Sequence, residues 1–116
     1  MAWLVRGGDV LATLELAERR AARRRGLLGR DAVEGALLLR PVRHVHSFGM
    51  RIPIDVAYCD ADLVVLRIAR LDRNRPGPVV RSTRAVVEAE VGAFERWKVV
   101  VGDQLEVRGA EGGEGT

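Results

Sequence analysis

The amino-acid sequence predicts a mainly β domain, either a β-sandwich or a partly closed barrel, with mostly antiparallel strands and one short helix in the N-terminal half. Three observations support this prediction. Apolar and polar residues alternate over several short segments, turn-forming Gly, Pro, Asp and Asn residues separate these segments, and only one sizeable stretch has the composition of a helix. A chain of 116 residues is also long enough for one domain and too short for two.

The first half of the chain is expected to contain a strand, a helix and a second strand. Residues 10–16 alternate between apolar and polar side chains, which predicts a half-buried strand. Residues 18–25 are rich in Ala, Arg and Glu, and Gly26 follows them at the position of a C-terminal cap, so we expect a helix of about two turns. The apolar residues 36–39 form a short strand, which ends at Pro41.

A β-hairpin is expected in the middle of the chain. Residues 54–58 and 63–71 both alternate between apolar and polar side chains, and the Asp-Ala-Asp turn at 60–62 separates them. Residues 45–50, which precede this pair, are expected to be extended. Residues 73–78 contain two prolines and a glycine, which interrupt strand pairing and predict a loop.

The last part of the chain is expected to hold two strands and one helical turn. The strands are predicted at 85–91 and 104–108, and the helical turn at 93–97. Residues 109–116 are rich in Gly and Glu and have almost no apolar side chains to bury, so we expect a disordered tail. The sequence therefore predicts a single β-rich domain over residues 1–108.

The positive charge of the chain is almost entirely arginine. Of 19 basic residues only Lys98 is a lysine, and 16 acidic residues oppose them. Five arginines lie within residues 19–25, but on a helix they spread around most of the circumference and do not form one phosphate-binding face. Aromatic residues that could stack on bases make up only 4% of the chain, so arginine-mediated nucleic-acid binding is an alternative and not the expected function.

Other features exclude several classes of protein. The longest apolar runs are far shorter than the ~20 residues of a membrane-spanning helix, and the N-terminus lacks the basic and apolar pattern of an export signal. We therefore expect a cytoplasmic protein that does not bind membranes. Cys59 is the one cysteine, so no internal disulfide is expected, and its ordinary role is that of a small buried thiol. No cofactor is expected.

The two histidines of the chain give the candidate metal site. On an extended segment His44 and His46 point the same way, and two imidazoles on one face can share a metal ion. A third ligand would have to come from Asp55, Asp60 or Asp62, and the spacing selects none of them. A metal-assisted hydrolase or oxygenase that uses the two histidines is therefore an alternative function.

A second cluster of residues favours the binding of an anion. Arg51 and Asp55 are four residues apart around a proline, so they can pair across a bend, or Arg51 can present its guanidinium group to an anionic ligand. Arg30 follows the predicted helix, and if it converges with Arg51 the two form a site for a carboxylate or a phosphate. The candidate ligand-binding residues are therefore Arg30, His46, Met50, Arg51 and Asp55.

Three blocks of the sequence together form a recognisable pattern. They are residues 24–30, residues 46–56, and a final set that comprises Ala85, Glu88, Gly92, Gly102 and Asp103. With them the chain resembles domain-of-unknown-function family 192, whose members are small bacterial and archaeal domains. Many members have a Trp where this chain has Gly49, so any role of that Trp does not apply here. The resemblance implies a compact, barrel-like sandwich, and it implies no reaction and no catalytic residues.

The sequence thus predicts a non-enzymatic binding or accessory module, with a polar pocket for a small anionic ligand or for a segment of a protein partner. The alternatives are the metal-assisted enzyme and arginine-mediated nucleic-acid binding. If the candidate residues do not share one pocket, their segment is instead a folding signature. In that case Phe48 and Met50 lie in the core, Pro53 sets a bend and Asp55 caps a turn.

Overall fold

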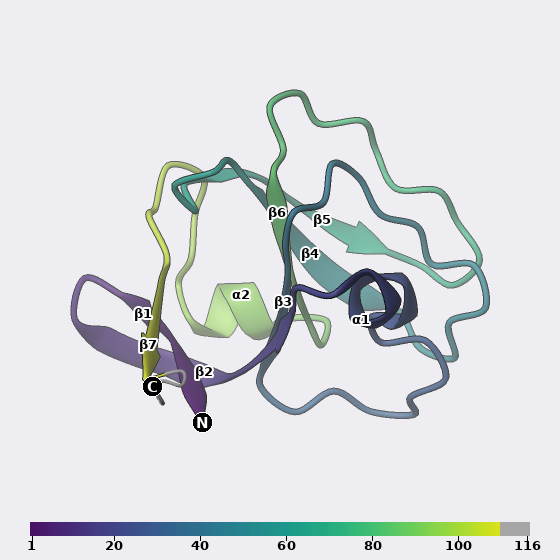
Figure 1. Cartoon of the computed structure of the whole chain (residues 1–116), viewed down its shortest axis with the longest axis horizontal. Coiled ribbons are helices and arrows are strands. Elements are labelled where there is room, and N and C mark those ends of the chain that lie inside the picture. The colour runs from purple at the N-terminus through teal and green to yellow at the C-terminus, as the bar shows by residue number, and fades with distance from the viewer. Residues whose placement is uncertain (110–116) are drawn as a thin grey trace.

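A single sheet of seven strands forms the centre of the computed structural model, which describes residues 1–109 (Figure 1). In chain order the elements are β1 (Ala2–Arg6), β2 (Asp9–Ala17), α1 (Arg20–Arg25), β3 (Ala36–Leu39), β4 (Ile54–Cys59), β5 (Val65–Leu71), β6 (Ala85–Ala89), α2 (Ala93–Arg96) and β7 (Glu106–Gly109). The strand order is β5-β4-β6-β3-β2-β1-β7, and five of the six pairings are antiparallel. The parallel pairing joins β2 to β3. Parallel neighbours need a crossover connection, and here that connection contains α1.

The predicted mainly β fold with mostly antiparallel strands is confirmed. The β-sandwich and the partly closed barrel are not confirmed, since the strands form one mixed sheet that is not closed. Backbone hydrogen bonds nevertheless attach the segment before β7 to the start of β5. The amide of Val65 donates to the carbonyl of Asp103 at 2.8 Å, and the amide of Leu105 donates to the carbonyl of Leu63 at 2.9 Å.

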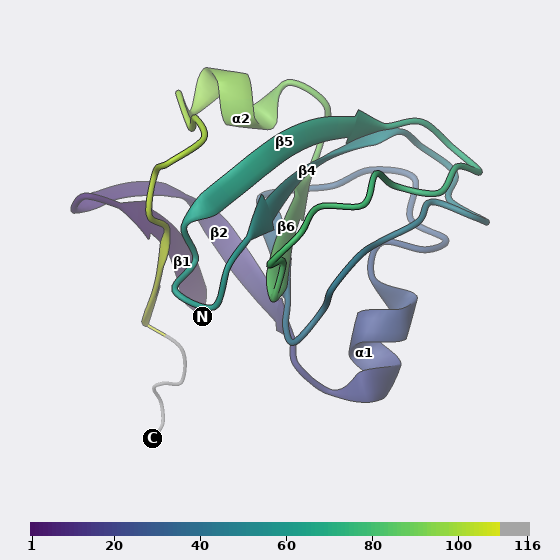
Figure 2. The same ribbon diagram turned by 90° about the horizontal axis from the view of Figure 1, so that it is seen from above.

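The sheet carries apolar side chains on both faces, and one helix lies against each face (Figure 2). Neighbouring residues of β6 show the alternation, because Val86 belongs to the same buried cluster as Leu27 on the α1 face and Val87 belongs to the cluster of Phe94 on the α2 face. A strand that is buried on both faces has a continuous apolar sequence, as β3 does. Within the described residues, no helix is long and apolar enough to cross a membrane.

The predicted local elements are largely confirmed. The hairpin is β4 and β5, and Oδ1 of Asp60 holds its turn by accepting hydrogen bonds from the amides of Asp62 at 2.9 Å and Val64 at 3.0 Å. The predicted N-terminal helix is α1, and it ends at Gly26 with a φ of 48°. The predicted helical turn is α2.

The strand β1 is not among the predicted elements. A bulge at Leu4 and Val5 buries both side chains, so the segment lacks the alternation of a half-buried strand. β1 forms a hairpin with β2, and the turn uses Gly7 and Gly8, whose φ values are 58° and 92°. These positive angles favour glycine because it has no side chain to clash.

The structure differs from two further predictions. The segment 45–50 is a loop, because Gly49 has a φ of 81° and the segment makes one isolated bridge, between His46 and Pro76. The predicted tail starts at Gly109, which instead ends β7. The remaining tail residues, 110–116, lie outside the described part of the chain.

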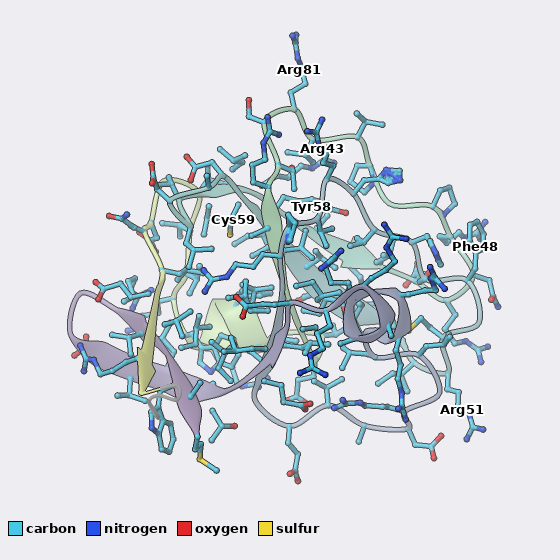
Figure 3. All side chains as sticks on the ribbon, viewed as in Figure 1. Arg43, Phe48, Arg51, Tyr58, Cys59 and Arg81 are labelled. Atoms are coloured by element: carbon cyan, nitrogen blue, oxygen red, sulfur yellow. The ribbon has the colours of Figure 1, made fainter. Side chains whose placement is uncertain are left out.

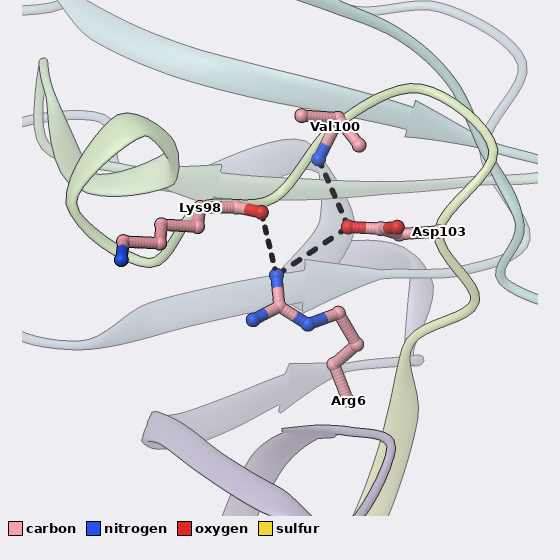
Figure 4. A network of polar contacts seen from close by, with 4 residues as sticks. All are labelled: Arg6, Lys98, Val100 and Asp103. Carbon is pink, nitrogen blue, oxygen red and sulfur yellow. Dashed lines mark hydrogen bonds and ion pairs between the residues drawn. The ribbon is translucent and has the colours of Figure 1, made fainter.

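Polar contacts attach the loop before β7 to the end of β1 (Figure 4). Arg6 donates to the carbonyl oxygen of Lys98 at 2.8 Å and pairs with Oδ2 of Asp103 at 3.4 Å. The same carboxylate oxygen accepts a hydrogen bond from the amide of Val100 at 3.0 Å. Gly102 reaches a φ of 97° in this turn. The Gly-Asp pair of the sequence pattern is therefore part of a structural turn.

Candidate ligand-binding pocket

A pocket of about 300 Å³ lies between α1 and the loop of residues 42–50, on the α1 face of the sheet. We call it the α1 pocket. Its volume is at the lower end of the roughly 300–1,000 Å³ of small-molecule sites. Much of its wall is apolar and comes from the end of α1, from β3 and from the loop, namely from Leu27, Leu28, Leu39, Val42, Val45, Phe48 and Met50.

Arginine side chains give the α1 pocket a positive edge. Four of them line it, namely Arg20, Arg23, Arg24 and Arg25. Residues three and four positions apart share one side of a helix, which explains why Arg20, Arg23 and Arg24 reach the same pocket. No residue of α1 is buried. Nη1 of Arg23 donates a hydrogen bond to the carbonyl oxygen of Glu18, so Arg20, Arg24 and Arg25 are the arginines best placed to meet a ligand.

Glu88 is the acidic residue of the α1 pocket. It lies on β6, directly between Leu37 of β3 and Val56 of β4, so its strand neighbours are apolar. Glu88 is only 5% exposed, and among the described residues it makes no hydrogen bond or ion pair. Burial raises the pKa of Glu88 to about 7, and the positive charge of Arg30 opposes this shift. Buried carboxyl groups are normally paired, so Glu88 is the unusual group of this site.

Gly26 leaves room for the carboxyl group of Glu88. A Cβ atom at Gly26 would lie 3.4 Å from Oε1 of Glu88 and 3.7 Å from Cδ2 of Leu39. The φ of Gly26 is 48°, a value that residues with side chains rarely adopt. The glycine that ends α1 therefore also lets the backbone approach the buried acid.

Two of the five predicted ligand-binding residues, His46 and Met50, line the α1 pocket, and the other three do not. Arg30 binds Glu15 through both terminal nitrogens, at 2.7 and 3.0 Å, and this contact lowers the pKa of Glu15. Arg30 lines two neighbouring hollows of about 540 and 490 Å³, where it is already paired with this acid. Arg30 is therefore not available to an anion in either hollow, although Arg19 and Arg25 also line the second of them.

Arg51 and Asp55 do not pair, so the first of the two alternatives for these residues is wrong. Arg51 pairs with Asp31 at 3.1 Å on the edge of the molecule, where both side chains are exposed (Figure 3). Oδ2 of Asp55 accepts a hydrogen bond from the amide of Gly92 at 2.8 Å. Strand alternation explains the separation, because the two neighbours of Asp55 in β4 face α1 and Asp55 faces the other side. Different acids hold Arg30 and Arg51, so the two arginines do not form one anion site.

Both histidines line the α1 pocket. Nδ1 of His46 accepts a hydrogen bond from the amide of Phe48 at 3.1 Å, so in the neutral ring the other nitrogen carries the proton. Within residues 1–109, no group of three His, Cys, Asp or Glu side chains is placed to hold a metal ion. The third ligand that the metal-assisted alternative requires is therefore not found beside His44 and His46 in this part of the chain.

We call the loop of residues 42–50 the pocket loop. Some of its residues stabilise the fold. The amide of Ser47 donates to the carbonyl of Arg75 at 2.8 Å, and its fully buried hydroxyl accepts from the amide of Arg75 at 2.9 Å and donates to the carbonyl of Asp72. Met50 is buried, as a folding signature requires. Phe48 is 52% exposed and lies at the periphery, so its predicted place in the core is wrong (Figure 3). Ser47 therefore attaches the pocket loop to the loop that follows β5.

Replacement Ser47→Ala is expected to lower the free energy of unfolding by about 1–3 kcal/mol, because it leaves buried backbone groups without their partner. Urea denaturation followed by circular dichroism measures the change. The exposed Ser82 gives the matched control, since Ser82→Ala is expected to change the stability by less than about 0.5 kcal/mol. Equal stability of the two variants would show that the hydroxyl of Ser47 does not hold the loops together.

Glu88 and the arginines of α1 are site residues that the sequence predictions miss. Glu88 interrupts the apolar segment of β6 at a position that shares a face with Val86. An acid inside a strand that is apolar on both faces is the signal that could have identified it. The arginines are visible as a cluster, but only the position of the loop 42–50 shows that some of them face a pocket.

Comparisons with known proteins place the chain in a family and support its fold. The family model DUF192, described as Uncharacterized ACR, matches residues 3–107. A comparison with curated proteins gives no match. A protein of unknown function from Novosphingobium aromaticivorans DSM 12444 has a similar structure, with a TM-score of 0.74, 23% identity, and coverage of 90% of this chain and 82% of that chain.

A second similar structure is a proposed transcription regulator from Sinorhizobium meliloti 1021. It has a TM-score of 0.73 and 24% identity, and the match covers 91% of this chain and 91% of that chain. At these identities the two structures show a shared fold alone.

Proposed function

The chain belongs to domain-of-unknown-function family 192, and we propose that it is a non-enzymatic binding module, whose α1 pocket takes a small ligand with an acidic group and an apolar body. The supporting observation is that one cavity combines an arginine edge with an apolar wall. Guanidinium groups bind carboxylates and phosphates through two parallel hydrogen bonds. The apolar wall stabilises the remainder of the ligand by removing it from water.

The positions of two potential nucleophiles support binding rather than catalysis. Cys59 is buried on the α2 face, away from the α1 pocket, and burial raises the pKa of its thiol to about 12. The thiol therefore stays protonated and unreactive near neutral pH. The hydroxyl of Ser47 is occupied by backbone groups of the neighbouring loop.

The double variant Arg20→Gln/Arg24→Gln is expected to bind small acids at least about tenfold more weakly than the wild type, because charge-assisted hydrogen bonds contribute about 1.5–3 kcal/mol each. Isothermal titration calorimetry measures this loss with hexanoate, 5-aminopentanoate and inorganic phosphate as probes. Arg81→Gln is the matched control, since Arg81 projects from the molecule outside the α1 pocket (Figure 3). This control is expected to bind as the wild type does.

The proposal is wrong if no small acid binds, whether or not the acid also carries an amine. It is also wrong if the α1 arginines bind an oligonucleotide instead, with an affinity that falls steeply as salt is added and that the double variant abolishes.

A further inference from the structure

We propose that the ligand of the α1 pocket is a small zwitterion, whose ammonium group pairs with Glu88 while its acidic group pairs with the α1 arginines. This inference rests on the proposed function, because it keeps the acidic group at the arginine edge. It adds a second group of opposite charge inside the cavity. Apolar α-amino acids and short ω-amino acids belong to this chemical class.

Within the described chain, Glu88 has no counterion of its own. Its neighbours on β3 and β4 are apolar. Arg30 is the cation that influences Glu88 from outside the pocket, but both of its terminal nitrogens are bound to Glu15. Tyr58 faces the same side of the sheet, and burial raises the pKa of its phenol to about 12, so it stays neutral. Glu88 lines the α1 pocket, and its Oε1 lies beside Gly26, another residue of the pocket wall.

The charges around the α1 pocket select for a ligand with one group of each sign. An ammonium group that reaches Glu88 replaces the partner that a buried carboxylate otherwise lacks, and water is largely excluded from that contact. A ligand with an ammonium group alone is repelled by the four arginines at the edge. A second acidic group deep in the pocket is repelled by Glu88.

Pairing of a ligand's ammonium group with Glu88 is also expected to release a proton. Burial holds the pKa of Glu88 at about 7, so at pH 7 a large share of the molecules carry a neutral carboxyl group there. An ammonium group favours the ionised form, so binding of a zwitterion releases a proton, whereas binding of the acid without the amine does not. His44 and His46 also line the pocket, and the variant Glu88→Gln leaves both in place, so a loss of proton release in that variant assigns the proton to Glu88.

Isothermal titration calorimetry at pH 7 tests the inference with matched ligands. Hexanoate has a methyl group where 5-aminopentanoate has its ammonium group, and 4-methylpentanoate is leucine without its amine. The two zwitterions are 5-aminopentanoate and leucine. We expect at least one of them to bind at least about tenfold more tightly than the matched acid that lacks the amine. Proton release is measured as the difference in binding enthalpy between Bis-Tris and Tris buffers, which differ in ionisation enthalpy and carry no acidic group that competes for the α1 arginines. Pentylamine, which has the ammonium group alone, is expected to bind more weakly than 5-aminopentanoate.

The variant Glu88→Gln keeps the size of the side chain and removes its charge. It is expected to reduce the preference for the zwitterion to less than about threefold and to abolish the proton release. The Glu95→Gln variant, which removes an exposed carboxylate on α2 outside the α1 pocket, is expected to retain both. Circular dichroism confirms that each variant is folded.

Two results separate the inference from the function on which it rests. If hexanoate and 4-methylpentanoate bind as tightly as the amino acids, or if Glu88→Gln leaves the preference unchanged, the inference is wrong and the proposed function stands. If none of these acids binds, the proposed function fails, and the inference fails with it.

Discussion

Replacement Gly35→Ala is expected to lower the free energy of unfolding by at least about 4 kcal/mol, or to prevent folding altogether. Gly35 has a φ of +70°, where a side chain strains the backbone. A Cβ atom there would lie 2.6 Å from the carbonyl oxygen of Thr13 and would also contact Oγ1 of Thr13. Because the carbonyl belongs to the backbone of β2, a change of rotamer cannot relieve the clash.

The position of Gly35 in the sheet makes this clash costly. Ala36, the next residue, starts β3 and pairs with Leu14 of β2 in the parallel pairing. That pairing joins the strands β5-β4-β6-β3 to the strands β2-β1-β7. A shift of β3 away from β2 therefore weakens the strand pairing between the two parts of the sheet, which are otherwise joined by the backbone hydrogen bonds between the start of β5 and the segment before β7.

Gly29→Ala is the matched control for the backbone strain alone. Gly29 has a φ of +81°, and a Cβ atom there has no neighbour within 4 Å. We expect this variant to lose about 1–2 kcal/mol, and urea denaturation followed by circular dichroism compares it with Gly35→Ala. If the two variants are equally stable, β2 accommodates the new methyl group and the clash does not determine the effect.

The stability of the protein without ligand is expected to fall as the pH rises from 5 to 8, and Glu88→Gln is expected to remove this fall. Burial raises the pKa of Glu88 from 4.5 to about 7 on folding. Between these values the folded protein binds more protons than the unfolded chain, so the free energy of unfolding decreases with pH. The full stability is present below about pH 4.5, and about 3 kcal/mol of it is lost above about pH 7.

Urea denaturation at pH values between 5 and 8 measures this effect. Glu88→Gln is expected to be more stable than the wild type at pH 8, by up to about 3 kcal/mol, and the difference is expected to shrink toward pH 5. Glu95→Gln is the matched control, because Glu95 is exposed on α2 and its replacement leaves the pH dependence unchanged. Parallel pH curves for the wild type and Glu88→Gln would show that the Glu88 carboxylate is solvated in the folded protein.

Much of the fold is predicted by patterns that lie within one short segment of the sequence. The hairpin of β4 and β5 is predicted because its alternation and its turn, which Asp60 holds, lie within one segment. β1 is not predicted, because the bulge at Leu4 and Val5 breaks the alternation. The parallel pairing of β2 with β3 depends on a contact across α1 that neither strand reveals alone.

The candidate site is predicted only in part, for a related reason. His46 and Met50 are predicted site residues that line the α1 pocket. Asp55 faces the other side of the sheet from Ile54 and Val56, as the alternation in residues 54–58 implies, but the alternation does not show which face carries the pocket. Arg51 meets Asp31 from a distant loop, and no periodicity encodes such a contact. Glu88 becomes a site residue only because α1 and the pocket loop pack over its face.

The helix that forms one wall of the α1 pocket has six residues, and none of them is buried. A helix this short is not stable by itself in water, so α1 depends on Leu27, which packs into the sheet directly after it. Local unfolding of α1 therefore requires less free energy than opening of the central strands. Such unfolding widens the entrance while the strands stay paired. A ligand that contacts both α1 and Glu88 therefore stabilises α1 against this local unfolding.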